Sequence, residues 1–346
     1  MDEAEVMITV EGRSGRLTLA RPRALHALTL DMCRRMTEAL LAWREDPAVE
    51  AVVIDHAGPR GFCAGGDVRA VAEGGPALAQ DFFRTEYRLN TLLHRYPKPT
   101  VAMMDGVVMG GGLGLSWPCR FRVATERTVM AMPEGAIGLF PDVGMGWRLA
   151  RLPGRMGLWF ALTGARIGPA DALLLGLATD YVPSARAEGV VRAFAEGPER
   201  GEAALTELEG DAGEPPISLV RDRIDRTFGE PTVEAIVAAL ERDGSPWAEE
   251  QLAALRAHSP TTLKVALRQL REAAALPRLE DEMALEFRLA LRITGGHDFK
   301  EGVRSVLVDK DRNPRWDPPR LEAVDEARIE ALFAPAAPGE DWTPLP

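Results

Sequence analysis

Short apolar runs with strand character alternate with helical patterns up to about residue 185. The runs include AVVIDHAG from Ala51, TVAMMDG from Thr100, CRFRVAT from Cys119 and TVMAMPE from Thr128. Strands that alternate with helices are typical of crossover connections between strands, and they disfavour folds that keep the two kinds of element in separate blocks. The sequence therefore predicts an α/β architecture for this part of the chain.

The start of the chain predicts a hairpin followed by a helix. Met7 to Val10 and Arg16 to Leu19 flank the turn sequence EGRSG and are expected to form two short strands. Thr29 is a suitable N-cap for a helix. Apolar residues follow it at helical spacing, namely Leu30, Cys33, Met36, Leu40 and Leu41.

Beyond Ala185 the pattern changes, because amphipathic helix candidates follow one another. They are SLVRDRIDRTF, VEAIVAALERD, TTLKVALRQLREAAA and LEDEMALEFRLALRI. We therefore expect a first region over residues 1–195 and a mostly helical second region over residues 217–334. The acidic, glycine-rich segment from Glu196 to Pro216 is predicted to be a flexible connection, and the final PAAPGEDWTPLP is predicted to be frayed.

Composition narrows the class of protein. The 346 residues, 46% of them hydrophobic, suffice for a stable core, and the net charge of −11 argues against nucleic acid or an anionic membrane as the main partner. The 3 cysteines form no CxxC pair and the 5 histidines no HxxxH pair, so neither a disulfide framework nor a metal site is indicated. The N-terminus is acidic and no long uncharged apolar run occurs, so we expect a cytoplasmic protein.

Two glycine-rich turns follow predicted strands. RGFCAGGDVRA contains Gly65 and Gly66, with Asp67 able to cap the next helix, and MGGGLG contains Gly110 to Gly112. Glycines at such turns let the backbone approach a ligand, so two turns can direct two N–H groups at one oxyanion. Tight packing of helix against strand explains either turn equally well. Neither turn is a nucleotide signature, because the third glycine of GxGxxG would fall on Leu115 and no GxxxxGK[ST] is present.

The stretch MPEGAIGLFPDVGMG places Glu134 and Asp142 eight residues apart among glycine, proline and aliphatic side chains. A carboxylate taken out of water needs a partner or a proton, so a pair in apolar surroundings indicates chemistry. The alternative is that both lie on a surface loop or cap helices. A nucleophilic side chain is not indicated elsewhere, because Ser116 lacks a GxSxG context and no cysteine has a readable histidine partner.

Four segments in this order resemble the crotonase superfamily. They are RPRALHAL from Arg21, GFCAGGDVRA, DGVVMGGGLGLS and MPEGAIGLFPDVG. FRVATE and the late block GGHDFKEGVRSVLVDKDRNPRW make the chain resemble, within that superfamily, the 3-hydroxyisobutyryl-CoA hydrolases. The resemblance covers nearly the whole chain. It implies a spiral of ββα turns for the first region and a helical C-terminal region that helps to cover an acyl-CoA site.

The resemblance also implies roles for individual residues. It places the N–H groups of an oxyanion hole on Gly66 and Gly111 and catalytic roles on Glu134 and Asp142. Typical hydratases of the superfamily carry a second glutamate just after the glycine run, where this chain has Gly114. Hydration by two glutamates would lack half of its acid/base machinery here, which favours hydrolysis.

Substrate contacts are implied at further positions. Glu86, in FFRTEYRLN, matches a substrate-contacting residue, although on sequence alone it reads as a solvated helix residue. CoA-binding positions are implied at Arg23, Ala24, Leu25, Ala64 and Lys310. The alternative for Lys310 is a plain surface charge within the sequence DKDR. His26 departs from the asparagine that is common in the superfamily, and an effect on loop support is expected.

The implied reaction is hydrolysis of the thioester of a short 3-hydroxyacyl-CoA, in the first place 3-hydroxyisobutyryl-CoA of valine breakdown. Glu134 either attacks the carbonyl or activates a water, and Asp142 binds the 3-hydroxyl and assists proton transfer to the thiolate. CoA enters as part of the substrate, without a separate cofactor or metal, and a homo-oligomer is possible. The alternatives are an enoyl-CoA hydratase/isomerase on the same fold and a silent acyl-CoA-binding protein.

Overall fold

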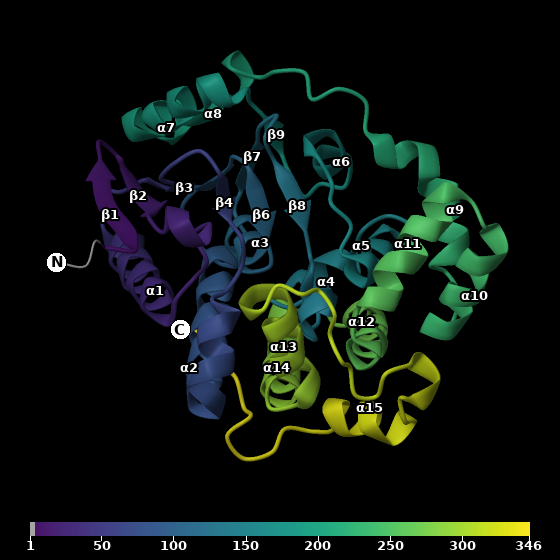
Figure 1. Cartoon of the computed structure of the whole chain (residues 1–346). Helices are drawn as coiled ribbons and strands as arrows, with labels where there is room; N and C mark the ends of the chain where they lie inside the picture. The colour runs from purple at the N-terminus through teal and green to yellow at the C-terminus, as the bar shows by residue number, and fades with distance from the viewer. Residues whose placement is uncertain (1–3) are drawn as a thin grey trace.

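The computed structural model of the chain describes residues 4–346 (Figure 1). Its strands are β1 (Val6–Glu11), β2 (Ser14–Leu19), β3 (Ala51–His56), β4 (Gly61–Cys63), β5 (Thr100–Met104), β6 (Val107–Met109), β7 (Phe121–Ala124), β8 (Val129–Ala131) and β9 (Asp180–Tyr181). The helices of the first half are η1 (Pro22–Ala24), α1 (Leu30–Glu45), α2 (Val68–His94), α3 (Gly111–Ser116), η2 (Glu134–Ile137), α4 (Met145–Leu149), α5 (Met156–Thr163) and α6 (Pro169–Leu174).

The remaining elements are all helical. The longer ones are α7 (Ala187–Glu196), α8 (Pro198–Glu207), α9 (Arg221–Thr227), α10 (Val233–Asp243), α11 (Pro246–Ala257), α12 (Pro260–Ala273), α13 (Leu279–Thr294), α14 (His297–Val303), the π-helix η5 (Arg304–Val308) and α15 (Glu326–Phe333). Three short 3₁₀ helices lie between them, η3 (Ser184–Arg186), η4 (Pro216–Val220) and η6 (Leu321–Ala323). Thr29 caps α1 by accepting a hydrogen bond from the Met32 N–H, and Asp67 caps α2 in the same way from Ala70. Both caps were predicted from the sequence.

Two sheets form the frame of the first half. The larger has the order β1-β2-β3-β5-β7-β9, with β1 antiparallel to β2 and the rest parallel, and the smaller has the order β4-β6-β8. The pairs β3–β4, β5–β6 and β7–β8 each contribute one strand to each sheet, and a helix follows each of the first two pairs. This is the repeating ββα spiral that the resemblance implies, and the α/β prediction is confirmed.

The strand β3 in the middle of the larger sheet is buried on both faces, and successive side chains of the strand point to opposite faces. Ala51 and Val53 of β3 face a cluster that includes Val190 and Phe194 of α7. Val52 and Ile54 face the main core, which continues into the helices of the second half. The uninterrupted apolar run of β3 follows from this double burial.

The helices of the second half pack against the first half. Figure 1 shows α13 and α14 beside α2, and contacts join α2 to both helices. α12 contacts α4 and α5, and η5 and α14 both contact η2. A Cβ atom at Gly302 of α14 would collide with the backbone of Ile137, so α14 and η2 are in direct backbone contact.

Two expectations about loose segments were wrong. The segment from Glu196 to Pro216 contains α8, whose buried residues Gly201, Ala204 and Leu205 recur at helical spacing on the face packed against α7. The end of the chain is not frayed, because Trp342 is buried and arginines of α2 bind backbone carbonyls of the tail, Arg84 that of Asp341 and Arg88 that of Thr343. Composition alone was therefore misleading in both segments. The acidic segment has apolar residues at helical spacing, and the tail is held by hydrogen bonds to the distant helix α2.

Candidate active site

The two glycine turns meet at one place. Gly66 immediately precedes the cap of α2, and Gly111 is the first residue of α3. A Cβ atom at Gly111 would lie only 3.2 Å from the Gly66 nitrogen, which places the two backbones in contact. Within residues 4–346 neither the Gly66 nor the Gly111 N–H donates a hydrogen bond, so both donors are available to a ligand.

Gly110 brings one carboxylate to this turn. Its backbone angles, φ +48° and ψ −120°, are open to glycine but not to residues with a side chain. A Cβ atom there would lie 2.9 Å from Oε1 of Glu134, so that carboxylate packs directly on the turn. Glu134 is the first residue of η2, and the Glu134 side chain is only 5% exposed.

Glu86 reaches the same turn from the other side. It lies on α2 beyond a kink at Gly75, and it is 2% exposed rather than solvated. A Cβ atom at Gly111 would come within 2.5 Å of its Oε1, and one at Gly66 within 3.9 Å. The structure therefore brings Glu86, Glu134, Gly66 and Gly111 together.

Asp142 completes the group from the loop between η2 and α4. Its Oδ2 accepts a 2.8 Å hydrogen bond from the Tyr87 hydroxyl, and its side chain is 5% exposed. Oε1 of Glu86 and Oε2 of Glu134 have no hydrogen-bond partner in the described part of the chain. Buried oxygens without partners are costly, so these two oxygens are placed to meet a substrate or a water.

Burial and mutual repulsion keep protons on this group. Burial raises the pKa of Asp142 to about 7, against the lowering effect of the Tyr87 hydrogen bond. Burial, and then the Asp142 carboxylate, raise the pKa of Glu134 and of Glu86 well above the ordinary glutamate value. The three groups interact, so they titrate as a set rather than independently.

The position of Gly114 has no room for a side chain. A Cβ atom there would lie 2.7 Å from Cβ of Val143 and 3.0 Å from Nδ2 of Asn90. Asn90 is fully buried one helical turn after Glu86, and neither of its amide atoms has a hydrogen-bond partner among residues 4–346. This chain therefore lacks the second glutamate of the hydratases and also the space for its side chain, which Val143 and Asn90 occupy.

Part of the segment implied to hold CoA lies beside the glycine turn. The Ala64 N–H donates a 2.9 Å hydrogen bond to the Leu25 carbonyl, while Arg23 and Ala24 are exposed.

His26 supports the loop that contains these residues, since its Nδ1 accepts a 3.0 Å hydrogen bond from the Arg21 N–H. Its φ of +57° suits the usual asparagine and is tolerated by histidine. Burial, followed by repulsion from His56, lowers the pKa of His26 to about 4, which keeps Nδ1 free to accept.

The structure does not join Lys310 to the other residues that are implied to bind CoA. It is exposed, with φ +58°, two residues beyond the end of η5. No hydrogen bond or ion pair within residues 4–346 joins its side chain to the segment from Arg23 to Leu25. The segment around it is fixed, because Arg304 binds both of its neighbours in the chain, Asp309 and Asp311. Its role toward CoA remains a prediction.

Sequence reasoning missed Tyr87 and Asn90. Both lie on the buried face of α2, where Glu86, Leu89 and Leu93 are also buried. A polar residue on the apolar stripe of a helix is a signal that could have identified them.

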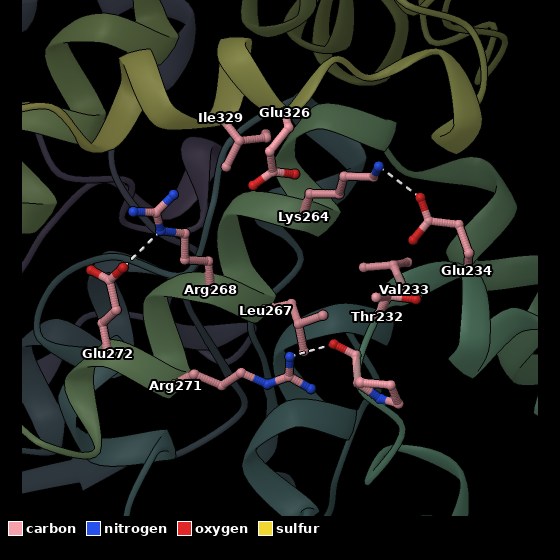
Figure 2. Close-up of a pocket in the computed structure, with 11 residues that line it drawn as sticks. Thr232, Val233, Glu234, Lys264, Leu267, Arg268, Arg271, Glu272, Glu326 and Ile329 are labelled. Atoms are coloured by element: carbon pink, nitrogen blue, oxygen red, sulfur yellow. Dashed lines mark hydrogen bonds and ion pairs between the residues drawn. The ribbon is translucent and has the colours of Figure 1, made fainter.

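A pocket of about 430 Å³ elsewhere contains none of the predicted site residues. Figure 2 shows it between α10, α12 and α15, with three cationic side chains of α12 on its wall. Lys264 pairs with Glu234, Arg268 with Glu272, and Arg271 donates to the Pro231 carbonyl. These three cations therefore already have partners within the pocket wall.

No helix described by the structure is long and apolar enough to cross a membrane. Residues 14–333 match the model of a family described as enoyl-CoA hydratase/isomerase. The chain is 43% identical over 345 residues to the mitochondrial 3-hydroxyisobutyryl-CoA hydrolase of Gallus gallus, an alignment that covers 96% of this chain and 89% of that protein. The relative is named mitochondrial, so the expected cytoplasmic location stays a prediction.

Two solved structures are similar over almost their whole length. A carnitinyl-CoA dehydratase from Mycobacterium thermoresistibile is 42% identical with a TM-score of 0.94, and 99% of each chain is covered. An enoyl-CoA hydratase from Rhodobacter sphaeroides is 42% identical with a TM-score of 0.92, covering 98% of this chain and 100% of that one. The glycine turns, the buried carboxylates and these likenesses agree that the chain belongs to the enoyl-CoA hydratase/isomerase family, the crotonase superfamily, and within it is similar to 3-hydroxyisobutyryl-CoA hydrolases.

Proposed function

We propose that the protein is an acyl-CoA thioester hydrolase whose substrate is 3-hydroxyisobutyryl-CoA, as the name of the Gallus gallus relative suggests. The observation that carries the proposal is the buried set of Glu86, Glu134 and Asp142 around the glycine turns, together with the filled space at Gly114. The set supplies a nucleophile or base and an acid, and it lacks the second glutamate after the glycine run that hydration uses.

The Gly66 and Gly111 N–H groups hold the thioester carbonyl oxygen. As the carbonyl becomes tetrahedral its oxygen gains negative charge, and each fixed donor stabilises that charge by about 3 kcal/mol in comparable oxyanion holes. Both donors belong to the backbone of tight turns, so they need no reorganisation during the reaction.

Glu134 and Asp142 divide the remaining work. The Glu134 carboxylate attacks the carbonyl carbon, or takes a proton from a water that attacks it, and the carbon–sulfur bond breaks. Asp142 gives its proton to the leaving thiolate, and the proton lost by water during hydrolysis restores it. This division needs the negative charge of the set on Glu134 and a proton on Asp142. The pKa values of both groups are raised, that of Asp142 to about 7, so the set can hold a proton near neutral pH, and the oxyanion donors and the thiolate decide which carboxyl group uses it.

The two routes differ in one covalent intermediate. Direct attack by Glu134 forms a mixed anhydride, which borohydride reduces to an alcohol at residue 134, whereas attack by water leaves Glu134 unmodified. Rapid mixing of enzyme, substrate and borohydride, followed by mass spectrometry of the peptide that contains Glu134, separates them. The alcohol indicates the anhydride route, and an unmodified peptide during active turnover indicates direct attack by water.

The hydroxyl group of the substrate should matter for the rate. Asp142 and Glu86 are buried polar groups. An acyl chain without a 3-hydroxyl leaves Oε1 of Glu86 without a partner and Asp142 with the Tyr87 hydroxyl alone. We therefore expect thiol release from 3-hydroxyisobutyryl-CoA to be much faster than from isobutyryl-CoA. Equal kcat/KM values for the two substrates would contradict the assignment of the hydroxyl to these carboxylates.

Hydration of an enoyl-CoA is the second candidate, because the solved structures at 42% identity are named as a dehydratase and a hydratase. Crotonyl-CoA separates the two functions. A hydrolase releases thiol from the hydroxyacyl substrate and leaves the enoyl absorbance of crotonyl-CoA unchanged, whereas a hydratase removes that absorbance without releasing thiol. The second result would reject the hydrolase proposal. Thiol release from the hydroxyacyl substrate alone would support a role in valine breakdown. The location that we propose for the enzyme is the cytoplasm.

A further inference from the structure

A second group of buried polar side chains lies behind the loop that carries Asp142. Glu286 of α13 is fully buried, and its two oxygens accept hydrogen bonds from the Gly144 N–H at 2.7 Å and the Gly146 N–H at 3.2 Å. Gly144 caps α4 and Gly146 lies in its first turn, so no carbonyl of that helix can accept from these two N–H groups. The carboxylate of a distant helix therefore fixes the C-terminal side of the loop.

The N-terminal side of the same loop is fixed by α12. Gln269, which is also fully buried, donates from Nε2 to the Pro141 carbonyl at 2.9 Å and to Oε1 of Glu282 at 3.0 Å. Its Nε2 also lies 3.4 Å from Oε1 of Glu286. The backbone is therefore held on both sides of Asp142. Gln269 of α12 binds Pro141 before it, and Glu286 of α13 binds the start of α4 after it.

The backbone at the start of α4 is in close contact with the polar side chains of α12 and α13. A Cβ atom at Gly146 would collide with Glu282 and Gln269, so the loop backbone lies directly on the polar group. Burial of Glu286 carries a free-energy cost that is offset only while its oxygens keep their partners. Its two backbone N–H partners, Gly144 and Gly146, lie at the end of the loop and the start of α4, which makes the position of the loop and the position of Glu286 interdependent.

We propose that Glu286 is a positioning residue, which by holding Gly144 and Gly146 sets where the Asp142 carboxyl meets the 3-hydroxyl and the sulfur of the substrate. The inference rests on the proposed function of Asp142. It gives the helical second half a part in catalysis, since α12 and α13 hold the loop while α2 supplies Tyr87 to the carboxylate itself.

The variant Glu286→Gln tests the inference with little change of volume. The amide keeps one oxygen acceptor but turns an NH₂ group toward the second backbone N–H, so the loop must shift. A displacement of about 1 Å can cost about 100-fold in rate, and we expect kcat for 3-hydroxyisobutyryl-CoA to fall by that order with KM nearly unchanged. The slow turnover of isobutyryl-CoA, which lacks the hydroxyl, should fall by a much smaller factor.

A double-mutant cycle with Asp142→Asn shows whether the effect passes through Asp142. In the Asp142→Asn background Glu286→Gln should reduce kcat by less than about 3-fold, because contacting residues of one network are not additive. Glu272→Gln is the matched control, since this glutamate lies on the surface of α12 and pairs with Arg268. It should leave both substrates unaffected.

Each outcome has a distinct meaning. Equal losses on both substrates, or losses that multiply in the double variant, would overturn the positioning role and leave Glu286 a structural residue. Unchanged kcat in Asp142→Asn alone would reject the proposed function of Asp142 instead. Should Glu286→Gln not fold, as judged by its melting curve, Gln269→Met releases Pro141 on the other side of Asp142 and must give the same substrate-selective loss.

Discussion

The Tyr87 hydroxyl donates a 2.8 Å hydrogen bond to Oδ2 of Asp142, and both side chains are buried. Tyr87 follows Glu86 on α2, whereas Asp142 lies in a loop 55 residues further along the chain. The bond stabilises the charged form of Asp142 and opposes the effect of burial, which raises the pKa of Asp142 to about 7.

Tyr87→Phe is expected to move the alkaline limb of the pH–rate profile upward. If Asp142 must be protonated to assist the leaving thiolate, activity falls as pH rises through its pKa. Loss of the hydrogen bond raises that pKa further, by about one unit for a bond to a charged group. The profile of kcat/KM against pH measures the shift. Tyr96→Phe, which removes a bond to the Leu40 carbonyl, is the control and should leave the profile in place, and an unshifted limb in Tyr87→Phe would contradict the acid role.

Glu134→Gln should abolish most turnover without loss of substrate binding. The amide has nearly the same volume, but it is neither a nucleophile nor a base, so kcat for thiol release should fall by at least about 100-fold. KM should change little, because the segment from Arg23 to Leu25 and the two oxyanion donors are untouched. Turnover within a few-fold of the unmodified enzyme would exclude Glu134 from both routes. Glu126→Gln, a surface change beside Ser184, is the control.

Gly114→Ala is expected to destabilise the protein, and Gly114→Glu to fail as a route to hydratase activity. The first added carbon atom already meets Val143 at 2.7 Å and Asn90 at 3.0 Å, and overpacking of this kind costs about 1–3 kcal/mol. Thermal melting and the loss of crotonyl-CoA absorbance measure the two effects. Gly168→Ala is a matched control, since no atom lies within 4 Å of the added carbon. Equal melting temperatures for the two alanine variants would contradict the packing argument.

The residues near the glycine turns could be identified from the sequence because they lie in short motifs. Gly66, Gly111, Glu134 and Asp142 each belong to a segment whose local conformation fixes where the residue points. Resemblance chose which glycine of each turn faces the ligand, since glycine spacing alone does not distinguish Gly110 from Gly111. The structure separates them by backbone angle and by their contacts with Glu134 and Glu86.

The supporting residues could not be found in this way, because their roles depend on how distant helices pack. Glu286 and Gln269 are separated from the Asp142 loop by well over 100 residues of chain. The sequence carried one unused signal. Glu282 and Glu286 lie four residues apart on the stripe that also contains Leu279, Met283 and Phe287, so acidic residues interrupt the buried face of α13. Buried acidic residues in an apolar stripe indicate a polar contact with another element.

Glu282 gives the final prediction, which concerns stability rather than rate. Its Oε1 accepts from Gln269, its Oε2 has no partner among residues 4–346, and the side chain is fully buried. Burial raises the pKa of Glu282 from its ordinary 4.5 to about 7. Between these two values the folded protein keeps a proton that the unfolded chain releases. The free energy of unfolding should therefore fall as pH rises from about 4.5 to about 7.

Glu282→Gln imitates the protonated side chain and should remove this part of the pH dependence. The amide oxygen can keep the bond from Gln269, and the NH₂ group replaces the oxygen that has no partner. We expect the variant to be more stable than the unmodified protein by about 1–3 kcal/mol at pH 8 and nearly equal to it at pH 5. Urea denaturation at both pH values measures the difference, with Glu38→Gln, an exposed change on α1, as control. Parallel stability curves for Glu282→Gln and the unmodified protein would mean that Glu282 stays ionised in the fold, and the buried proton assigned to it would have to be abandoned.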